Sequence, residues 1–413
     1  MNMIRPFKGL RPSSDKASEV ASPPYDVMSY QEATLLAKGR ANSFLHISRP
    51  EIDLPEGTDP YSSEVYEKAS ENLKKLIDDN VLSREEVPCF YIYRLTGYGV
   101  CQSGLVVTAS VDAYDQNLIR KHEFTRPVKE DDRVCQIDQL RAQTGPVLLA
   151  YPSSKDIDDI IASETLSAPE QHVTASDGVQ HEIWTLSCQE KIAILVALFD
   201  DLPALYIADG HHRSAAASRV QKLMRGRAEG VSSGTESYDY FLAVAFPQDQ
   251  MKILAYNRVI TDLNGLNSKA FLERLRDEFD IQCSDEPVVP KTKGVMGAYF
   301  DGCWYTLTLR EKTKSADPVD SLDVSALSNR VLGPILGIND LRKDKRIDFV
   351  GGIRGTQELV RRVDSGAMAC AFSLYPTRIE ELMSVADGGQ VMPPKSTWFE
   401  PKLADGLISH VLD

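Results

Sequence analysis

The chain has 413 residues, of which 60 are acidic and 46 are basic, so its formal net charge is −14. This length is sufficient for a large core and predicts two or three structural units. The acidic balance argues against an extended nucleic-acid surface, which a basic patch would mark, and leaves room only for a local basic pocket.

Neither a membrane span nor a secretory signal is recognisable. No apolar run approaches the length of a bilayer, and the opening MNMIRPFKGL lacks the apolar core of a signal peptide. The seven cysteines are scattered without a Cys-x-x-Cys pair, which favours reduced thiols over disulfides or zinc. We therefore expect a cytoplasmic protein with no nucleic-acid or membrane partner, and the sequence leaves its oligomeric state open.

Secondary structure is predicted in chain order from periodicity and from turn residues. Helices are predicted at residues 29–40, 59–82, 128–143, 154–164 and 211–220, and in the amphipathic stretch 267–284. Strands are predicted in a hairpin at 89–114, after Pro146, at 181–187 and 204–208, and in a pair at 294–309. Residues 238–247 and 251–261 are predicted to pair as antiparallel strands. A further strand, helix and strand follow from Phe349, before a helix capped by Thr377.

This mixture of strand–helix alternation and hairpins predicts an α+β fold and not a doubly wound sheet. We divide the chain into an N-terminal α+β unit at 1–114, a central unit at 115–262 and a C-terminal α/β unit at 263–413.

The stretch ALYIADGHHRSAAASRV joins an apolar run of strand length to an Ala-rich helical segment. Gly210 permits a tight turn, and the first turn of the helix offers unpaired N–H groups that suit phosphate. Asp209 could be only the N-cap of the helix, with His211, His212 and Arg213 as solvated residues. The density of titratable groups favours a functional turn, and Ser214 joins the candidate phosphate or substrate ligands.

The segment IRKHEFT places Glu123 beside His122 and near Arg126. Such a glutamate could accept a hydroxyl proton while its basic neighbours hold phosphate, or the segment could be only a charged strand end. The charged run that follows adds Asp132 and Arg133 as candidates, against the alternative of a solvated first helical turn.

Two further segments carry candidate ligands. In MPPKSTWFEPK, Lys395, Ser396 and Thr397 suit phosphate or Mg²⁺, although the segment could also simply pack its aromatic residues. In NSFLHISRPE, His46 and Arg49 could reach a carboxylate or a phosphate.

Several motifs together resemble one family. RPFKGLRP, PPYDV, HISRPE, IRKHEFT, KEDDR, TGP, ADGHHRSAAA and MPPKSTWFEPK occur in this order, as in the family catalogued as domain of unknown function 1015. Members of that family resemble free-serine kinases of the ParB/sulfiredoxin-like superfamily, and some are described as pyrophosphate-dependent L-serine kinases. The resemblance implies a ParB/sulfiredoxin-like core at 115–262 and a Mg²⁺-dependent transfer from pyrophosphate to L-serine, which gives O-phospho-L-serine.

The resemblance also implies roles for individual residues. The run from Asp209 to Arg213 matches the phosphate-handling turn, and Glu123 matches the base, with the longer gap between them read as an insertion. Asp209 is a second catalytic candidate, and Asp209 and Glu123 are the candidate Mg²⁺ ligands. ADP, ATP and CTP remain open as donors. The alternatives are a CTP-binding switch protein and a phosphatase or pyrophosphatase that uses the same turn.

Overall fold

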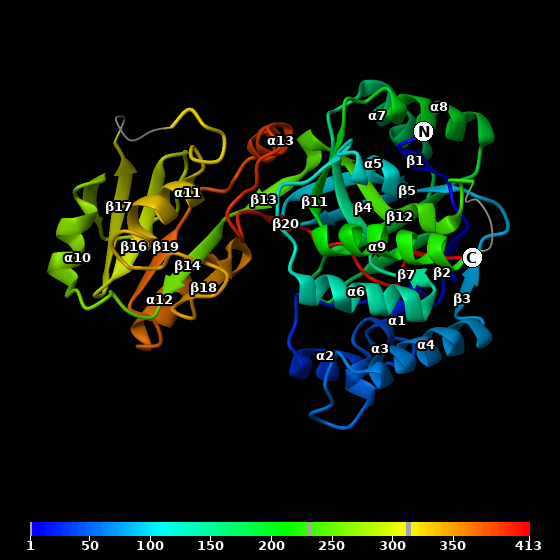
Figure 1. Ribbon diagram of the computed structural model, residues 1–413, viewed down its shortest axis with the longest axis horizontal. Helices are drawn as coiled ribbons and strands as arrows, with labels where there is room; N and C mark the ends of the chain where they lie inside the picture. The colour runs from blue at the N-terminus through cyan, green and yellow to red at the C-terminus, as the bar shows by residue number, and fades with distance from the viewer. Residues whose placement is uncertain (1, 229–232, 311–314) are drawn as a thin grey trace. The chain divides into compact units, whose positions relative to one another are not determined.

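The computed structural model describes residues 2–228, 233–310 and 315–413 (Figure 1). They form two units, of which the first comprises Met1–Met251 with Pro401–Asp413 and the second comprises Lys252–Glu400. The predicted α+β fold is confirmed, since both units combine sheets with helices. The predicted boundary near residue 114 falls inside the first unit, because strands on both sides of it pair in one sheet. The first unit also includes the C-terminal segment Pro401–Asp413. The predicted units are consecutive segments and therefore place this segment in the C-terminal unit.

The first unit is built on a nine-stranded mixed sheet with the order β6-β11-β8-β12-β5-β4-β10-β9, to which β1 adds by pairing with β5. Its strands are β1 (Ile4–Arg5), β4 (Phe90–Gly97), β5 (Val100–Ser110), β6 (Ile119–Arg120), β8 (Val147–Tyr151), β9 (Gln171–Thr174), β10 (Gln180–Leu186), β11 (Leu205–Asp209) and β12 (Tyr240–Pro247). The predicted hairpin at 89–114 is confirmed, since β4 and β5 pair directly.

The strand β12 lies in the middle of this sheet, between β5 and the parallel strand β8. All eight of its residues are buried, as an uninterrupted apolar run allows when both faces of a strand are covered. The predicted pairing of 238–247 with 251–261 is therefore wrong. The later residues form short strands that pair within the second unit instead.

Nine helices of the first unit lie among the described residues. They are α1 (Ala17–Val20), α2 (Tyr30–Ala37), α3 (Leu45–Ser48), α4 (Ser63–Asp78), α5 (Val111–Asp115), α6 (Pro127–Leu140), α7 (Lys155–Glu164), α8 (Gln189–Asp200) and α9 (His211–Arg227). Alternate strand residues such as Leu149 and Ile207 share a core with Ile161 and Leu195 of α7 and α8. The helices α6 and α9 lie side by side and share a second apolar cluster (Figure 1).

The helix α6 ends earlier than the predicted 128–143. Arg141 adopts a left-handed conformation at its C-cap, with φ of 51°, and Ala142 and Gln143 form β7.

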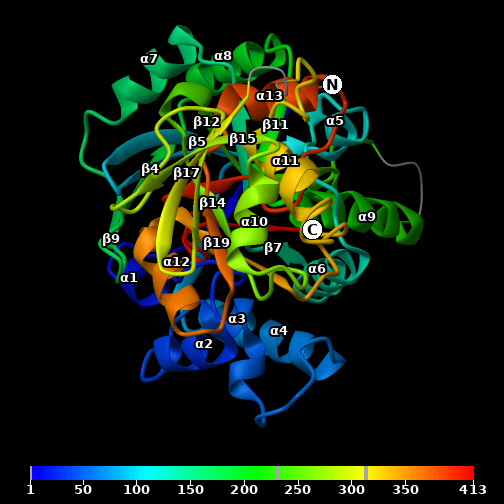
Figure 2. The same ribbon diagram turned by 90° about the vertical axis from the view of Figure 1, so that its left-hand side faces the viewer.

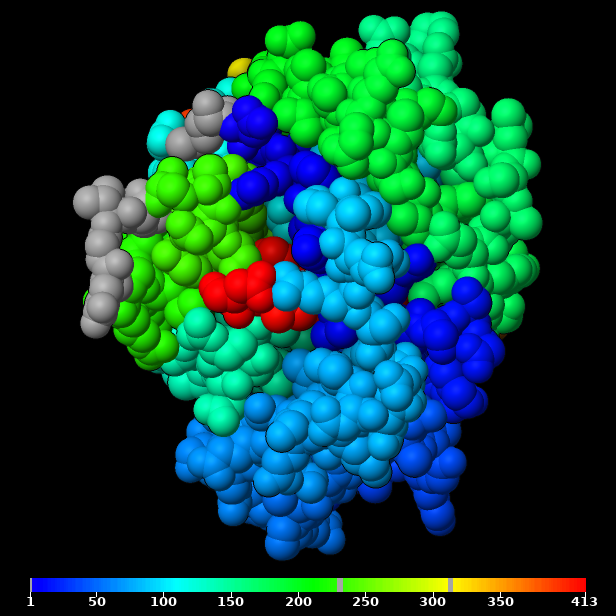
Figure 3. Space-filling model, turned by 90° about the vertical axis from the view of Figure 1, so that its right-hand side faces the viewer, coloured from blue at the N-terminus to red at the C-terminus, as the bar shows by residue number. Residues whose placement is uncertain are grey.

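A small sheet ties the C-terminal end of the chain to the first unit. Its order is β3-β2-β21-β7, from β2 (Gly9–Pro12), β3 (Leu82–Arg84), β7 (Ala142–Gln143) and β21 (Ser409–Val411). The red C-terminal end is visible on the face shown in Figure 3. Arg84 fixes it by an ion pair of 2.6 Å to Asp413. The segment that begins at Pro401 is thereby anchored next to elements formed early in the chain.

The second unit contains a six-stranded antiparallel sheet with the order β15-β17-β16-β19-β14-β18 (Figure 2). Its strands are β14 (Tyr256–Ile260), β15 (Phe279–Ser284), β16 (Val295–Phe300), β17 (Cys303–Leu309), β18 (Ile347–Gly351) and β19 (Cys370–Ser373), and β13 (Lys252–Leu254) pairs separately with β20 (Trp398–Glu400). Its helices are α10 (Ser268–Leu275), α11 (Asp323–Leu327), α12 (Gly355–Asp364) and α13 (Ile379–Asp387). The predicted strand pair at 294–309 is confirmed as β16 and β17.

Two predictions for the second unit are corrected. The stretch 267–284 is helical only as far as Leu275 and continues as β15. The N-cap of α13 is Arg378, whereas the hydroxyl of Thr377 donates to the carbonyl of Ser396 at 3.0 Å. Within the described ranges, no helix is both long and apolar enough to cross a membrane.

Candidate functional site

The predicted strand–turn–helix is present. β11 ends at Asp209, Gly210 is the N-cap of α9 with φ of 99°, and the helix begins at His211. Among the described residues no side chain caps this helix, and its first turn contains no acidic residue. Asp209 is therefore not an N-cap, so the alternative that Asp209 only caps the helix is excluded. A helix of 17 residues with uncapped N–H groups and no acidic residue in its first turn attracts an anion.

The Asp209 carboxylate is held by a cation from the C-terminal segment. Nζ of Lys402 donates to Oδ2 of Asp209 at 3.2 Å. Burial opposes ionisation of Asp209, but the charges of Lys402 and Arg213 and the Lys402 hydrogen bond outweigh it, so the pKa lies well below its usual value. Asp209 is thus ionised and already neutralised by protein cations.

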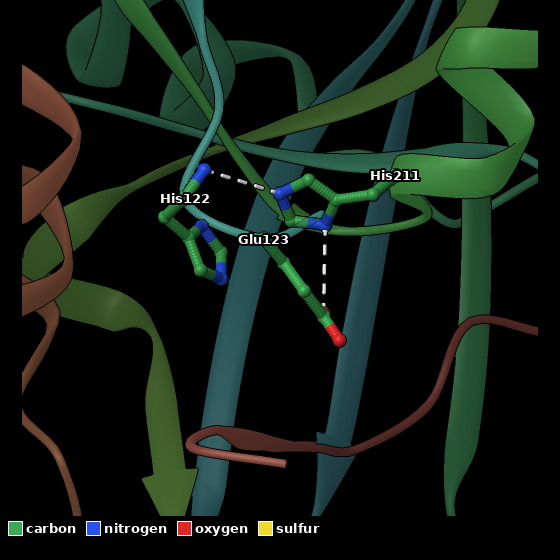
Figure 4. A group of neighbouring side chains, drawn as sticks. All are labelled: His122, Glu123 and His211. Carbon is green, nitrogen blue, oxygen red and sulfur yellow. Dashed lines mark hydrogen bonds and ion pairs between the residues drawn. The ribbon is translucent and has the colours of Figure 1, made fainter. Parts of the chain in front are cut away.

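Glu123 lies beside the first residue of α9. Oε2 of Glu123 is 4.0 Å from Nδ1 of His211, and Nε2 of His211 accepts the backbone N–H of His122 at 3.4 Å (Figure 4). The two imidazole rings meet edge to face with centroids 4.4 Å apart. The structure thus brings the predicted IRKHEFT segment onto the predicted turn, and the Glu123 side chain remains 37% exposed, which leaves it accessible to a ligand.

Both histidines in this group are neutral near pH 7. Burial lowers the pKa of His122 to about 4. Burial, followed by the proximity of His122, also lowers the pKa of His211 well below its usual value. Because Nε2 of His211 accepts an N–H, the single proton of the neutral ring is assigned to Nδ1, on the side of Glu123. His211 therefore directs an N–H towards Glu123 across 4.0 Å, and at 5% exposure it is too buried to be a simple surface ligand.

His212 connects the same two segments. Its Nε2 accepts the backbone N–H of Arg126 at 3.1 Å, and Arg126 is the N-cap of α6 with an exposed side chain. His211 and His212 thus each hold a backbone amide of the 122–126 segment. The side chain of Arg126 remains the exposed cation next to the turn.

The remaining candidates of the first unit have internal partners. The Ser214 hydroxyl is fully buried and donates to the carbonyl of His211 at 3.1 Å, so it is not directed at a ligand. Nδ1 of His46 bonds to Asp53 at 2.8 Å. Arg49 donates to Glu51 at 2.6 Å and to the carbonyl of Tyr25 at 3.0 Å. His46 and Arg49 therefore contact the N-terminal loops in this structure, and their ligand role stays a prediction.

Arg133 pairs with Asp132 at 2.8 Å, and its guanidinium lies 4.0 Å from the centre of the Tyr25 ring. Asp132 also accepts the hydroxyl of Tyr66 at 3.1 Å. Asp132 is buried rather than solvated, because α6 packs this face against α4. The two charges predicted as ligand candidates therefore form one buried ion pair, with Arg133 facing Tyr25.

Lys395, Ser396 and Thr397 belong to the second unit. Nζ of Lys395 lies 5.6 Å from the centre of the Tyr256 ring, and the Ser396 hydroxyl donates to the carbonyl of Pro393 at 2.5 Å. Thr397 immediately precedes β20. These contacts describe a loop packed within its own unit, and the phosphate role of the three residues stays a prediction.

The candidate metal ligands form a different set from the one predicted. Ligand atoms of His122, Glu123 and His211 lie within 4.8 Å of one another. Imidazole nitrogens suit zinc and other transition metals, whereas Mg²⁺ prefers oxygen ligands. Asp209, the other predicted ligand, is occupied by Lys402. These residues do not fit a Mg²⁺ ion held by the protein alone.

The fold and the turn define an α+β protein with an anion-attracting helix N-terminus beside a glutamate. The family model described as "Protein of unknown function (DUF1015)" matches residues 4–325, and the chain belongs to this family. No curated protein sequence matches the chain.

Solved structures show distant likenesses. A free serine kinase variant in complex with AMP is 13% identical, with 73% of this chain and 92% of that chain covered and a TM-score of 0.37. A conserved hypothetical protein from Pyrococcus furiosus is 14% identical, with 73% and 94% covered and a TM-score of 0.35. SbnI from Staphylococcus aureus, with a C-terminal truncation, is 11% identical, with 72% and 84% covered and a TM-score of 0.38. These likenesses are too distant to bear on activity.

Lys402, which the MPPKSTWFEPK segment offers as a further phosphate ligand, instead holds Asp209. The sequence did not single out Asp405 and Gly145, which lie next to Arg213. One signal was available, because Ala404-Asp405-Gly406 repeats the Ala208-Asp209-Gly210 of the turn. Both glycines have positive φ, of 90° and 99°.

Proposed function

We propose that this protein is a phosphotransferase that converts free L-serine and pyrophosphate into O-phospho-L-serine and phosphate. The observation that carries the proposal is the contact of Glu123 with the first turn of α9 through His211. It joins a carboxylate that can accept a proton to a helix N-terminus that can hold phosphate. Phosphoryl transfer needs this combination of charge stabilisation and positioning more than covalent catalysis.

In the proposed reaction, Glu123 accepts the proton of the serine hydroxyl as its oxygen attacks one phosphorus of pyrophosphate. The new O–P bond forms while the bridging P–O bond breaks, and orthophosphate leaves with the electron pair of that bond. The uncapped N–H groups of α9 and the exposed Arg126 side chain stabilise the charge on the donor oxygens. Because the protein residues do not fit a resident Mg²⁺, we propose that Mg²⁺ enters bound to the donor, and we assign no step to it.

A phosphorus NMR panel tests this proposal. The protein is incubated with Mg²⁺ and pyrophosphate, ADP, ATP or CTP in turn, with and without L-serine. The expected result is a phosphomonoester signal with pyrophosphate that appears only when L-serine is present. Orthophosphate release that does not depend on L-serine would instead identify a phosphatase or pyrophosphatase. A phosphomonoester that forms from L-serine with a nucleotide but not with pyrophosphate would show that pyrophosphate is not the donor.

The DNA-associated alternative has its own test. A CTP-dependent switch protein would bind DNA with an affinity that falls steeply as salt rises. A gel-shift assay at low salt with and without CTP is expected to show no binding.

A further inference from the structure

A small cavity is bordered by Arg213 and extends to Arg133. Its free volume is about 30 Å³, which is room for roughly two water molecules. Its walls include Tyr25, Ser48, Gly145, Arg213 and Asp405, all from the first unit. Four of the five come from segments far from the α9 turn in sequence, so the fold has assembled this space.

Two ionisable groups of opposite type line this cavity, the guanidinium of Arg213 and the carboxyl group of Asp405. The guanidinium of Arg213 donates to the carbonyl of Pro146, and Asp405 is only 3% exposed. Within the described ranges, neither side chain forms an ion pair of 4.0 Å or less. A ligand that carries both an ammonium and a carboxylate group would complement the two side chains by charge-assisted hydrogen bonds.

Gly145 keeps the space between the two charges open. A Cβ atom at this position would lie 3.3 Å from Oδ1 of Asp405 and 3.5 Å from Cδ of Arg213. The Ser48 hydroxyl, which also lines the cavity, is buried and has no hydrogen-bond partner among the described residues. An open gap, two ionisable side chains that form no ion pair with each other and an unsatisfied hydroxyl together describe a polar binding site and not a packing defect.

We propose that this cavity binds the α-amino and α-carboxylate groups of a small free amino acid, with the ammonium on Asp405 and the carboxylate on Arg213. The Ser48 hydroxyl supplies a hydrogen bond to the same ligand. The proposal rests on the proposed function for its substrate, L-serine, and gives Arg213 a role at the acceptor in place of the donor phosphate.

The cavity is narrow, which favours a ligand with a small side chain, and Tyr25 in its wall is half-buried.

The full-length protein is titrated by calorimetry with L-serine, with 2-aminoethanol, which lacks the carboxylate, and with 3-hydroxypropanoate, which lacks the ammonium. Each titration is run with and without pyrophosphate. L-Serine is expected to bind, and each truncated compound at least about tenfold more weakly, since each loses one charge-assisted contact. Asp405→Asn and Gly145→Ala are expected to weaken L-serine binding by at least about tenfold.

Gly226→Ala is the matched control. Neither Gly226 nor Gly145 has a positive φ, and a Cβ added at Gly226 would meet no atom within 4 Å. Gly145→Ala retains both charges, so it tests the cavity if Asp405→Asn fails to fold, and melting curves check folding of each variant.

Wild-type affinity in folded Asp405→Asn or Gly145→Ala would overturn the proposal, as would no L-serine binding with and without pyrophosphate. Phosphoserine formation is measured separately. L-Serine binding that requires Asp405 and Gly145, without phosphoserine from any donor, would refute the proposed function and leave the amino-acid site standing. Phosphoserine formation that is unchanged by both substitutions would refute the amino-acid site and leave the proposed function standing.

Discussion

Lys402 and Asp209 are 193 residues apart in sequence, and their side chains meet at 3.2 Å beside the N-terminus of α9. The pair links the C-terminal segment of the first unit to the end of β11. It also explains why Asp209, although the first titratable residue of the turn, is a poor candidate for a metal ligand.

Removing Lys402 is expected to reduce the contribution that the ionised Asp209 carboxylate makes to the free energy of unfolding. A carboxylate with a lowered pKa stabilises the fold above its unfolded pKa, and this stabilisation is lost as the pH falls through the folded pKa. Lys402→Met should therefore lower the melting temperature at pH 7 and differ less from the wild type near pH 3. Because both side chains are partly exposed, at 24% and 38%, the effect should be about 1 kcal/mol.

Lys155→Met is the control for this experiment. Lys155 pairs with Asp159 on the surface of α7, where the side chains are 83% and 63% exposed. Its melting curves should match the wild type at both pH values. A Lys402→Met protein with the same curves would show that the Asp209 contact contributes nothing to stability.

His211 is expected to act as a positioning residue for Glu123. His211→Asn places an amide N–H near the position of Nδ1, whereas His211→Leu removes the donor. His211→Leu should reduce kcat for phosphoserine formation by roughly 10- to 100-fold with little change in the donor KM, and His211→Asn should recover most of that loss. Equal losses in both variants would indicate a packing role, and a raised donor KM with unchanged kcat would indicate a phosphate contact instead.

Asp405 should reduce the stability of the ligand-free protein at high pH. Burial raises its pKa to about 7, with Arg213 and Arg133 opposing the shift and Asp26 adding to it. A carboxyl whose pKa is higher in the folded state favours folding while protonated, and this advantage is lost as the pH rises towards 7.

Asp405→Asn should therefore raise the melting temperature at pH 8 by several degrees and change it little at pH 4. The opposite trend would show that the carboxylate is ionised and paired in the folded protein. Tyr25, the remaining group that faces this carboxyl, does not titrate in this range, since burial raises its pKa to about 12.

Pyrophosphate alone should raise the melting temperature, because a ligand that binds only the folded state stabilises it by mass action. The shift should persist in Asp405→Asn and shrink in Arg126→Ala, since only the second substitution removes a cation near α9. Thermal melting at millimolar pyrophosphate without L-serine measures it. An unchanged melting temperature would point to another donor or to donor binding that requires the acceptor.

Local patterns predicted the parts of this structure that depend on neighbouring residues. The apolar run before Asp209, the glycine after it and the Ala-rich stretch that follows define β11, the turn and α9. The hairpin of β4 and β5 and the pair of β16 and β17 follow similarly from strand residues around a short turn.

Long-range contacts could not be predicted in this way. The position of β12 depends on its partner strands β5 and β8, and the apolar run of residues 238–247 does not identify them. His46 and Arg49 have side chains that suit a ligand, but the fold supplies them with Asp53 and Glu51. The position of Asp405 near Arg213 depends on the return of the C-terminal segment to the first unit.

The most direct test of the proposed function is the rate of phosphoserine formation in Glu123→Gln, measured beside the wild type and Asp209→Asn. Glutamine keeps the shape of Glu123 but cannot accept the proton, so kcat should fall by roughly 10²- to 10⁴-fold while the donor affinity is maintained. Asp209→Asn should weaken donor binding with a smaller loss of kcat, because it disturbs Lys402 beside the turn. Near wild-type turnover in Glu123→Gln together with an inactive Asp209→Asn would contradict the assignment and place the base on the turn itself.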